Sequence, residues 1–376
     1  MNNKFTTFLL TIILIILICG SVIFGIAIYQ DITGADSKSE IFKLGNIITE
    51  EPEQKQDRSL EISSSNMTLT QEKTEENISE ATENNTTDIT INKYFYNQLV
   101  GNQKTIYDKL LENKDKLKLG NYKIEYKDAF SDIITTEEGK EQLGNDYQTA
   151  IEAFMHDNPE LFYVDVNKML LNIETTTKFL RTTYNVYISS AENSTYLSDD
   201  FNDTEQIKVA IEKIENIKND IIKNLKGTDY DKIMQIHDFI VENADYDSTY
   251  QATGTYGIYG ALIGKKCVCE GYAKTLKYLA NAAGIKCEIM QGTATNSSGQ
   301  TESHAWNCVK INGIWYEIDA TWDDPIIVGT GYKANTYKYR YFLKGKNTFE
   351  KDHILSYQFS ENGKSFEYPI ISTRDY

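Results

Sequence analysis

Three polar residues in the last third of the chain are of types that together support covalent catalysis. Cys269 stands in VCEGYA, His304 in HAWNCVKI and Asp319 in IWYEIDATW. A cysteine thiolate is a strong nucleophile, and an imidazole that is oriented by a carboxylate is a common means of activating it. If the fold brings these side chains together, the expected chemistry is acyl transfer through a thioester on Cys269.

The position of Cys269 favours reactivity. The stretch from Cys269 to about Ala283 has the apolar spacing of a helix, and Gly284 suits a left-handed cap at its end. Cys269 then lies in the first turn, where unpaired backbone N–H groups and the positive end of the helix dipole favour the thiolate. We also expect Gly271 and Ala273 to leave space near the sulfur for a substrate backbone.

His304 and Asp319 lie on two alternating runs that are separated by Asn312 and Gly313. Asn-Gly between such runs predicts a two-residue β-hairpin. This register pairs Trp306 with Asp319, so His304 becomes the diagonal neighbour of Asp319 on the same face, with Cβ atoms roughly 7 Å apart. A carboxylate can reach an imidazole across that separation, so the register alone predicts a His–Asp pair.

These motifs resemble the transglutaminase-like superfamily, whose members share a papain-type core. The likeness covers about residues 230–325 and rests on HDFIVENADYD, VCEGYA and HAWNCVKINGIWYEIDATWDD, in the family's order. It implies Cys269 as nucleophile, His304 as general base and then general acid, and Asp319 as the group that holds His304. It also implies an α+β fold in which the Cys269 helix packs on an antiparallel sheet that carries His304 and Asp319. We expect no cofactor and no metal.

The resemblance leaves one expected group without an obvious candidate. The family places an oxyanion-stabilising side chain, often Trp, upstream of the nucleophile, but this sequence has no Trp before Trp306. Tyr246, Tyr256 and Tyr259 are the alternatives, each of which would donate beside the backbone N–H of Cys269. We favour Tyr246.

The first ninety residues predict an anchor and a tether. Residues 8–29 carry no charge over 22 positions, long enough to cross a bilayer, and Lys4 before them places the N-terminus in the cytoplasm. Residues 31–90 hold 14 acidic and 5 basic side chains, about half of the net charge of −17. This polar composition predicts disorder, and a charge of this sign without Lys/Arg clusters argues against nucleic-acid binding.

Four segments are therefore expected, which together resemble surface proteins of Gram-positive bacteria. The alternative of a cleaved signal peptide remains open, because the sequence alone does not decide it. Expected helices cover 96–117, 148–164, 205–225 and 230–247, and 178–189 alternates like a strand. The segments are a transmembrane signal anchor (1–30), a disordered stalk (31–91), an N-terminal α+β domain of unassigned function (92–200) and an extracellular catalytic domain (201–376).

Other polar residues favour structural roles. His237 lies beside an apolar helical stripe and is expected to be a packed, hydrogen-bonded residue. Cys287 and Cys308 are expected on neighbouring strands, as a disulfide or as packed thiols; with Cys267 and Cys269 their spacing does not suit zinc. The acidic run Asp319, Asp323 and Asp324 offers too few oxygens to predict calcium binding and is expected to be a solvated turn.

Three functions fit the sequence. The first is a cell-surface cysteine enzyme that cleaves or transamidates peptide amides, with cell-envelope peptides or surface proteins as substrates. The second is a catalytically silent module that uses the same groove to bind such peptides. In the third, the N-terminal domain is the working part, as an adhesin or assembly module.

Overall fold

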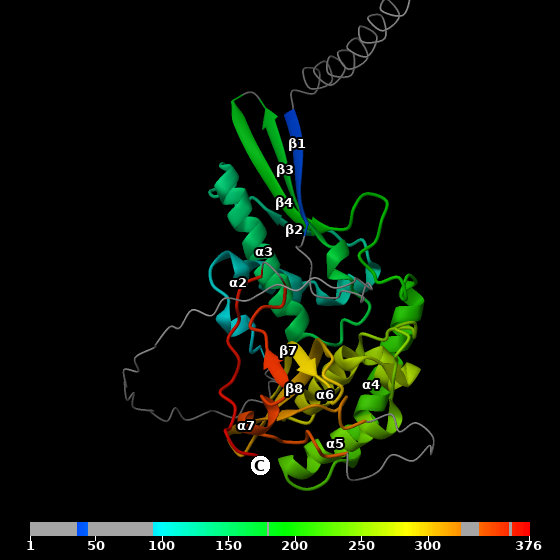
Figure 1. The fold of residues 1–376 in the computed structure, drawn as a ribbon. Coiled ribbons are helices and arrows are strands. Elements are labelled where there is room, and N and C mark those ends of the chain that lie inside the picture. The colour runs from blue at the N-terminus through cyan, green and yellow to red at the C-terminus, as the bar shows by residue number, and fades with distance from the viewer. Residues whose placement is uncertain (1–35, 44–92, 179, 325–337, 361–362) are drawn as a thin grey trace, which may run out of the picture.

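The computed structural model describes residues 36–43, 93–178, 180–324, 338–360 and 363–376. Their fold mixes helices and strands, with one four-stranded sheet at the top of the view in Figure 1 and another, surrounded by helices, below it. None of the helices in these ranges is long and apolar enough to cross a membrane, and the predicted span at residues 8–29 lies outside them.

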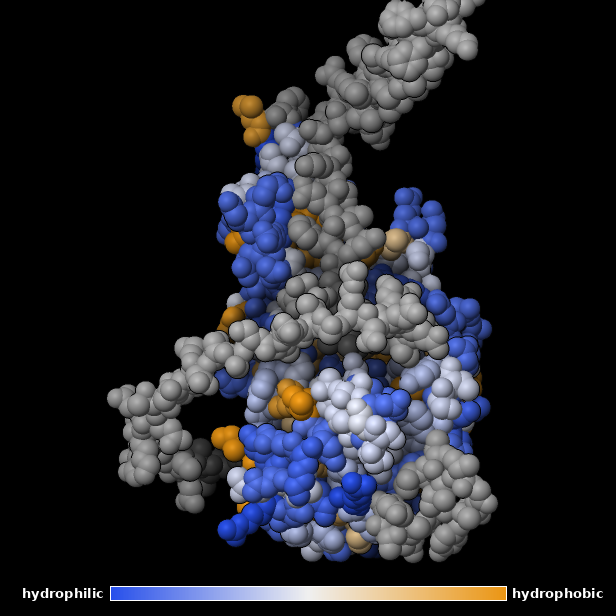
Figure 2. Space-filling model, viewed as in Figure 1, coloured by the Kyte–Doolittle hydropathy of each residue, from blue (hydrophilic) through white to orange (hydrophobic). Residues whose placement is uncertain are grey.

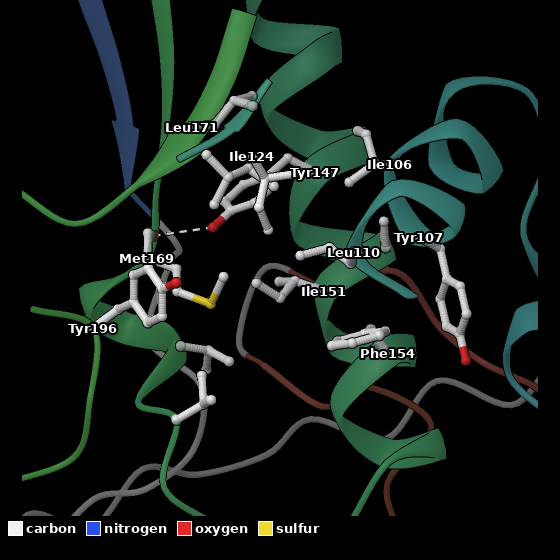
Figure 3. Close-up of a cluster of buried hydrophobic side chains, with 14 of the residues drawn as sticks. Ile106, Tyr107, Leu110, Ile124, Tyr147, Ile151, Phe154, Met169, Leu171 and Tyr196 are labelled. Atoms are coloured by element: carbon white, nitrogen blue, oxygen red, sulfur yellow. Dashed lines mark hydrogen bonds between the residues drawn. The ribbon is translucent and has the colours of Figure 1, made fainter. Parts of the chain in front are cut away.

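The N-terminal part, residues 93–200, contributes most of the upper sheet, whose antiparallel strands follow the order β1-β3-β4-β2. Helices cover the sheet and bury an apolar cluster against it (Figure 3). Within that cluster the Tyr147 hydroxyl donates to the carbonyl oxygen of Met169 at 3.0 Å. The elements are β1 (Asp36–Lys43), η1 (Tyr96–Gln98), α2 (Asn102–Glu112), η2 (Lys114–Leu119), β2 (Ile124–Lys127), α3 (Glu137–Asp157), η3 (Val166–Lys168), β3 (Leu170–Lys178) and β4 (Arg181–Ser189).

Two helix predictions in this part had wrong boundaries. The helix predicted over 148–164 is α3, which begins at Glu137, where the Thr136 side chain accepts from the backbone N–H of Gly139. It ends before Pro159, because the residue preceding a proline disfavours helical dihedrals. The helix predicted over 96–117 is divided into η1, α2 and η2, and Gly101, with φ of 49°, separates the first two.

Residues 36–43 differ from the disorder expected across 31–91. They form strand β1, which pairs antiparallel with β3 along its whole length. Composition measures how much apolar surface a segment can bury, but it does not reveal that a folded sheet elsewhere offers an unpaired edge. The remaining residues of the expected stalk, 31–35 and 44–91, lie outside the described ranges.

The C-terminal part, residues 201–376, holds the second sheet, in the order β10-β7-β8-β9, and a two-stranded parallel pair, β5 and β6. Helix α6 packs against β7, β8 and α5 (Figure 1). The elements are α4 (Thr204–Asn224), α5 (Asp229–Asn243), β5 (Asp245–Tyr246), η4 (Gly260–Gly264), β6 (Lys266–Cys267), α6 (Cys269–Ala282), β7 (Cys287–Thr295), β8 (Thr301–Ile311), β9 (Ile314–Ile318), α7 (Lys346–Phe349) and β10 (His353–Leu355).

The predicted hairpin is confirmed. Strands β8 and β9 pair with Asn307 opposite Ile318 and Ile311 opposite Ile314, which is the predicted register. Asn312 and Gly313 form the loop with φ of 51° and 84°, the two positive values that a type I′ turn requires. Helix α6 also begins at Cys269 as predicted.

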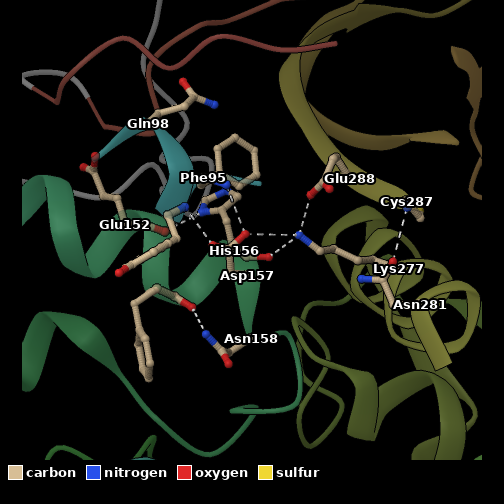
Figure 4. A network of polar contacts seen from close by, with 12 residues as sticks. Phe95, Gln98, Glu152, His156, Asp157, Asn158, Lys277, Asn281, Cys287 and Glu288 are labelled. Atoms are coloured by element: carbon tan, nitrogen blue, oxygen red, sulfur yellow. Dashed lines mark hydrogen bonds and ion pairs between the residues drawn. The ribbon is translucent and has the colours of Figure 1, made fainter. Parts of the chain in front are cut away.

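The two parts share a buried polar network around Lys277 of α6 (Figure 4). The Lys277 Nζ atom lies 2.7 Å from Glu288 Oε2, 2.6 Å from the His156 carbonyl oxygen and 3.9 Å from Asp157 Oδ1. Burial alone would lower the pKa of Lys277, but the two carboxylates raise it, so the side chain stays charged. Two C-terminal rings, Phe359 and Phe366, also belong to the apolar cluster of the N-terminal part.

On the face seen in Figure 2, the described residues are mostly hydrophilic and the hydrophobic ones form small, separate spots. Isolated apolar residues of this kind are normal on a protein surface. The hydrophobic spots on this face therefore do not mark a binding site, and the candidate site lies among buried polar side chains.

Candidate active site

His304 and Asp319 form a buried pair at the start of the site. The Nε2 atom of His304 lies 2.8 Å from Asp319 Oδ2, and the two residues are 5% and 0% exposed. The other carboxylate oxygen, Oδ1, accepts from the backbone N–H groups of Thr321 at 2.9 Å and Trp322 at 3.1 Å. The two backbone donors thus hold the Asp319 carboxylate through Oδ1, while Oδ2 faces the His304 imidazole.

Cys269 is a second hydrogen-bond partner of the His304 imidazole. It is half-buried at the first turn of α6, beside Ala273, Ile289 and Ala305. Burial would lower the pKa of His304, but the Asp319 charge and hydrogen bond, together with a hydrogen bond to Cys269, raise it to about 10. Because Nε2 faces Asp319, Nδ1 is the nitrogen left to face the sulfur. The structure therefore brings the three predicted residues together.

The electrostatics of this group favour charge separation. Burial would raise the pKa of Asp319, but the facing imidazoles hold it well below its usual range, so the carboxylate stays ionised. An ionised carboxylate beside His304 favours the imidazolium, and an imidazolium beside a thiol favours the thiolate. The arrangement can therefore present a nucleophilic sulfur together with an acid, which is what acyl transfer requires.

A second imidazole, which the sequence analysis did not single out, completes the group. The Nε2 atom of His353 lies 3.2 Å from the same Asp319 oxygen that faces His304. His304, Asp319 and His353 offer donor atoms within 4.8 Å of one another and are the one such cluster among the described residues that could hold a metal ion. In this structure both imidazoles lie within hydrogen-bond distance of the Asp319 carboxylate.

The three tyrosines proposed for the oxyanion role lie in different surroundings. Tyr259 packs against the rings of Phe162 and Phe201, with centroids 5.8 and 4.8 Å away, and Tyr256 is 38% exposed. Burial, and then the nearby Cys269, raise the pKa of Tyr246 well above its usual range, so its hydroxyl keeps a proton to donate. The influence of Cys269 on this pKa places the Tyr246 hydroxyl near the nucleophile, which supports Tyr246 as the donor.

The acidic run after β9 is not a solvated turn as predicted. Asp319, Asp323 and Asp324 are all buried, and each carboxylate binds a different partner. Asp323 Oδ2 lies 3.1 Å from His237 Nε2, and Asp324 Oδ2 accepts from the Tyr272 hydroxyl at 2.6 Å. The spacing suggested exposure, but in the fold the run connects the hairpin to α5 and α6.

The prediction of His237 as a packed, hydrogen-bonded residue is confirmed.

The other cysteines of the C-terminal part are buried thiols. Cys267, Cys287 and Cys308 are buried and form no disulfide, so of the two alternatives for the strand pair the structure has packed thiols. Burial is the main cause that raises the pKa of each. A buried neutral thiol is inert, so Cys269 differs from these three in its exposure.

We expected Gly271 to leave space for a substrate beside the Cys269 sulfur, but Gly271 instead packs closely against Cys267 and Thr255. A Cβ atom at this position would come within 2.6 Å of the Cys267 Cβ atom and 2.8 Å of the Thr255 carbonyl oxygen. Gly271→Ala should therefore destabilise the protein by about 1–3 kcal/mol, because the clash is with backbone and core atoms. Gly264→Ala, whose nearest neighbour would be 3.6 Å away, is the matched control in urea unfolding; equal stability of both variants would contradict the packing.

A cavity of about 580 Å³ lies beside the site and is lined by Trp306, His353 and Glu317, among others. Burial raises the pKa of Glu317 from 4.5 to about 7, although Trp306 Nε1 donates to its carboxylate at 2.9 Å. The folded state therefore binds this proton more tightly than the unfolded state does. Its contribution to stability should be present at pH 4.5 and should be lost as the pH rises to about 7.

We expect Glu317→Gln to remove this loss. The difference between the folded and unfolded pKa values corresponds to about 3 kcal/mol, which the wild type should lose between pH 4 and 8 relative to the variant. Urea unfolding of both proteins at the two pH values measures it. Parallel pH dependence in the two proteins would mean that Glu317 is not the group responsible.

Comparisons with known proteins agree with the motifs. Residues 215–320 match the Transglutaminase-like superfamily. The kyphoscoliosis peptidase of Mus musculus is 31% identical over 99 residues, and that of Homo sapiens 28% over 140 residues. These matches span 24% and 34% of this chain but 15% and 21% of the relatives, so the chain corresponds to a small share of those proteins.

Two solved structures are similar to part of this chain. A TGase crystal structure has 14% identity and a TM-score of 0.28, covering 45% of this chain and 48% of that one. The periplasmic domain of TgpA from Pseudomonas aeruginosa has 10% identity and a TM-score of 0.24, covering 43% and 73%. Scores this low carry no argument about function. The match over residues 215–320 covers Cys269, His304 and Asp319, so this region of the chain is a transglutaminase-like domain.

Proposed function

We propose that this chain is a cell-surface cysteine enzyme that forms an acyl-enzyme on Cys269 and cleaves or transamidates peptide amide bonds. The observation that carries the proposal is His304, whose Nε2 faces Asp319 at 2.8 Å while its other nitrogen is left for Cys269. The superfamily includes cysteine peptidases and acyltransferases, so the chemistry fits the fold. The surface location rests on the uncharged segment at residues 8–29 and the positive charge before it.

The residues present suffice for both halves of the reaction. The Cys269 sulfur attacks the amide carbonyl carbon, and the oxyanion that forms accepts from the Cys269 backbone N–H and, in our proposal, from the Tyr246 hydroxyl. His304 then gives its Nδ1 proton to the leaving nitrogen, the C–N bond breaks, and a thioester remains. Water or a primary amine next loses a proton to His304, attacks the thioester carbonyl and releases the Cys269 thiolate.

A thiol-reactive probe tests whether Cys269 is activated. Wild-type protein should label at Cys269 at neutral pH, and the other cysteines of the described residues should not, because they are buried. Cys269→Ala supplies the background, including any signal from Cys19. If the wild type labels no faster than this variant, the enzyme proposal fails and the peptide-binding alternative becomes the better one.

The fate of the thioester separates hydrolysis from transfer. Incubation with a glutamine-containing peptide and a fluorescent primary amine, followed by mass spectrometry, gives one of two products. Covalent amine incorporation assigns an acyltransferase, whereas the free acid alone assigns a peptidase or amidase. Both products must disappear in Cys269→Ala.

A further inference from the structure

Both ring nitrogens of His353 face carboxylates. Nδ1 lies 2.8 Å from Asp352 Oδ1, and Nε2 lies 3.2 Å from Asp319 Oδ2. The ring is 2% exposed, so water does not replace either contact. The second oxygen of Asp352 accepts from the Tyr341 hydroxyl at 2.7 Å, so the outer carboxylate is itself held in place.

The two contacts of His353 bear on how many N–H groups its ring carries. An ionised carboxylate accepts hydrogen bonds and donates none, so each contact needs an N–H from His353. A neutral imidazole has one N–H, whereas an imidazolium has two. A His353 ring that donates to both carboxylates carries two N–H groups and bridges Asp352 and Asp319.

The aromatic surroundings suit a buried cation. Four rings lie around His353, with centroid distances of 4.5 to 5.4 Å, within the range in which an aromatic ring attracts a cation. They also surround the ring with apolar surface, which strengthens the two charge-assisted hydrogen bonds. The four rings belong to Phe349, Trp322, Trp306 and Tyr341.

We propose that His353 is a positioning residue for the reaction proposed above: as an imidazolium it fixes the Asp319 oxygen that orients His304. This inference rests on the proposed function for its consequence in catalysis, but not for the charge of the ring. His304 and His353 share one oxygen, at 2.8 and 3.2 Å, so the carboxylate cannot turn away from either. The titratable groups around His353 are Asp319, Asp352, His304, Tyr341 and Glu317, and Lys346 and Glu350 line the same cavity.

The charge of the ring is tested without any substrate. In the full-length protein labelled with ¹⁵N-histidine, NMR at pH 7 should show that both nitrogens of His353 are protonated, with the signal assigned by its loss in His353→Ala. The chain has four histidines, so the spectrum is simple. An unprotonated nitrogen on His353 would overturn the proposal. Because this readout needs no turnover, an inactive wild type would overturn the proposed function and leave this result standing.

The positioning role is tested by chemical rescue. His353→Ala should lower kcat about 10- to 100-fold with KM unchanged, as expected when reacting groups are misplaced. His353 lines the cavity, so added imidazole can enter the vacated space. Imidazole should restore most of the lost rate, whereas 1-methylimidazole, which fills the space but can donate once at most, should not. Equal rescue by both compounds, or no loss of kcat, would leave His353 with a packing role and contradict the proposal.

Two further variants keep the test decisive. Asp352→Ala changes a more exposed side chain and should fold if His353→Ala does not; it should remove the second proton from His353 and lower kcat in the same direction. His237→Gln alters another buried histidine that pairs with a carboxylate, and should lower stability while leaving kcat within about twofold. A normal kcat in Asp352→Ala together with loss of the second proton would show that the charge does not matter for catalysis.

Discussion

Asp319→Asn should reduce amide turnover by about 10³- to 10⁴-fold, the size of the effect when a triad carboxylate becomes an amide. The amide keeps the shape of the side chain but carries no charge, so it cannot stabilise the His304 imidazolium beside Cys269. Its NH₂ group can also occupy the position of Asp319 Oδ2, where it cannot accept a hydrogen bond from His304 or His353. Steady-state release of ammonia from a glutamine-containing peptide measures the change.

The matched control for this substitution is Asp323→Asn. Asp323 is also buried, lies in the same turn and binds a histidine, His237, at 3.1 Å. It should therefore lose stability without a comparable loss of turnover. If both variants lose activity equally, or if Asp319→Asn keeps a tenth of wild-type turnover, the special role of Asp319 is contradicted.

Lys277→Met should destabilise the protein by about 3–5 kcal/mol, because it leaves buried carboxylates without their cation. Asp157 lies in the N-terminal part and Glu288 in the C-terminal part, so both parts should be affected. Urea unfolding measures this by two signals. All three tryptophans lie in the C-terminal part and report it by fluorescence, whereas circular dichroism reports both parts.

Lys208→Ala provides the control for the Lys277 substitution. Lys208 pairs with Glu205 on the exposed side of α4, and such surface pairs contribute about 0–1 kcal/mol. The midpoint of unfolding should move for Lys277→Met in both signals and hardly move for Lys208→Ala. A shift in one signal alone would mean that the network does not couple the two parts.

The sequence predicted the site where the information is local. The Asn312-Gly313 turn determines the hairpin register, and that register places His304 beside Asp319. The apolar spacing after Cys269 predicted α6 and the place of the nucleophile at its start. Both patterns act over a few residues, so a single sequence is enough to read them.

The features that the sequence did not predict depend on contacts between distant residues. His353 lies 34 positions after Asp319, and its neighbours in the chain carry no motif. Lys277 lies on an amphipathic helix, where a lysine is normally exposed, and the His156 carbonyl that it binds is 121 positions earlier. The buried state of the acidic run likewise depends on helices α5 and α6. Such pairings follow from the tertiary fold, which local spacing does not determine.

The most direct test of the central claim is to capture the acyl group on Cys269. Wild-type protein is incubated with the glutamine-containing peptide, quenched in acid and analysed by peptide mapping. We predict an adduct of the peptide mass less ammonia on Cys269, which hydroxylamine removes because it is a thioester, and which is strongly reduced in His304→Ala. Absence of any adduct on wild-type Cys269 while the peptide is being consumed, or an equal adduct in His304→Ala, would contradict the account.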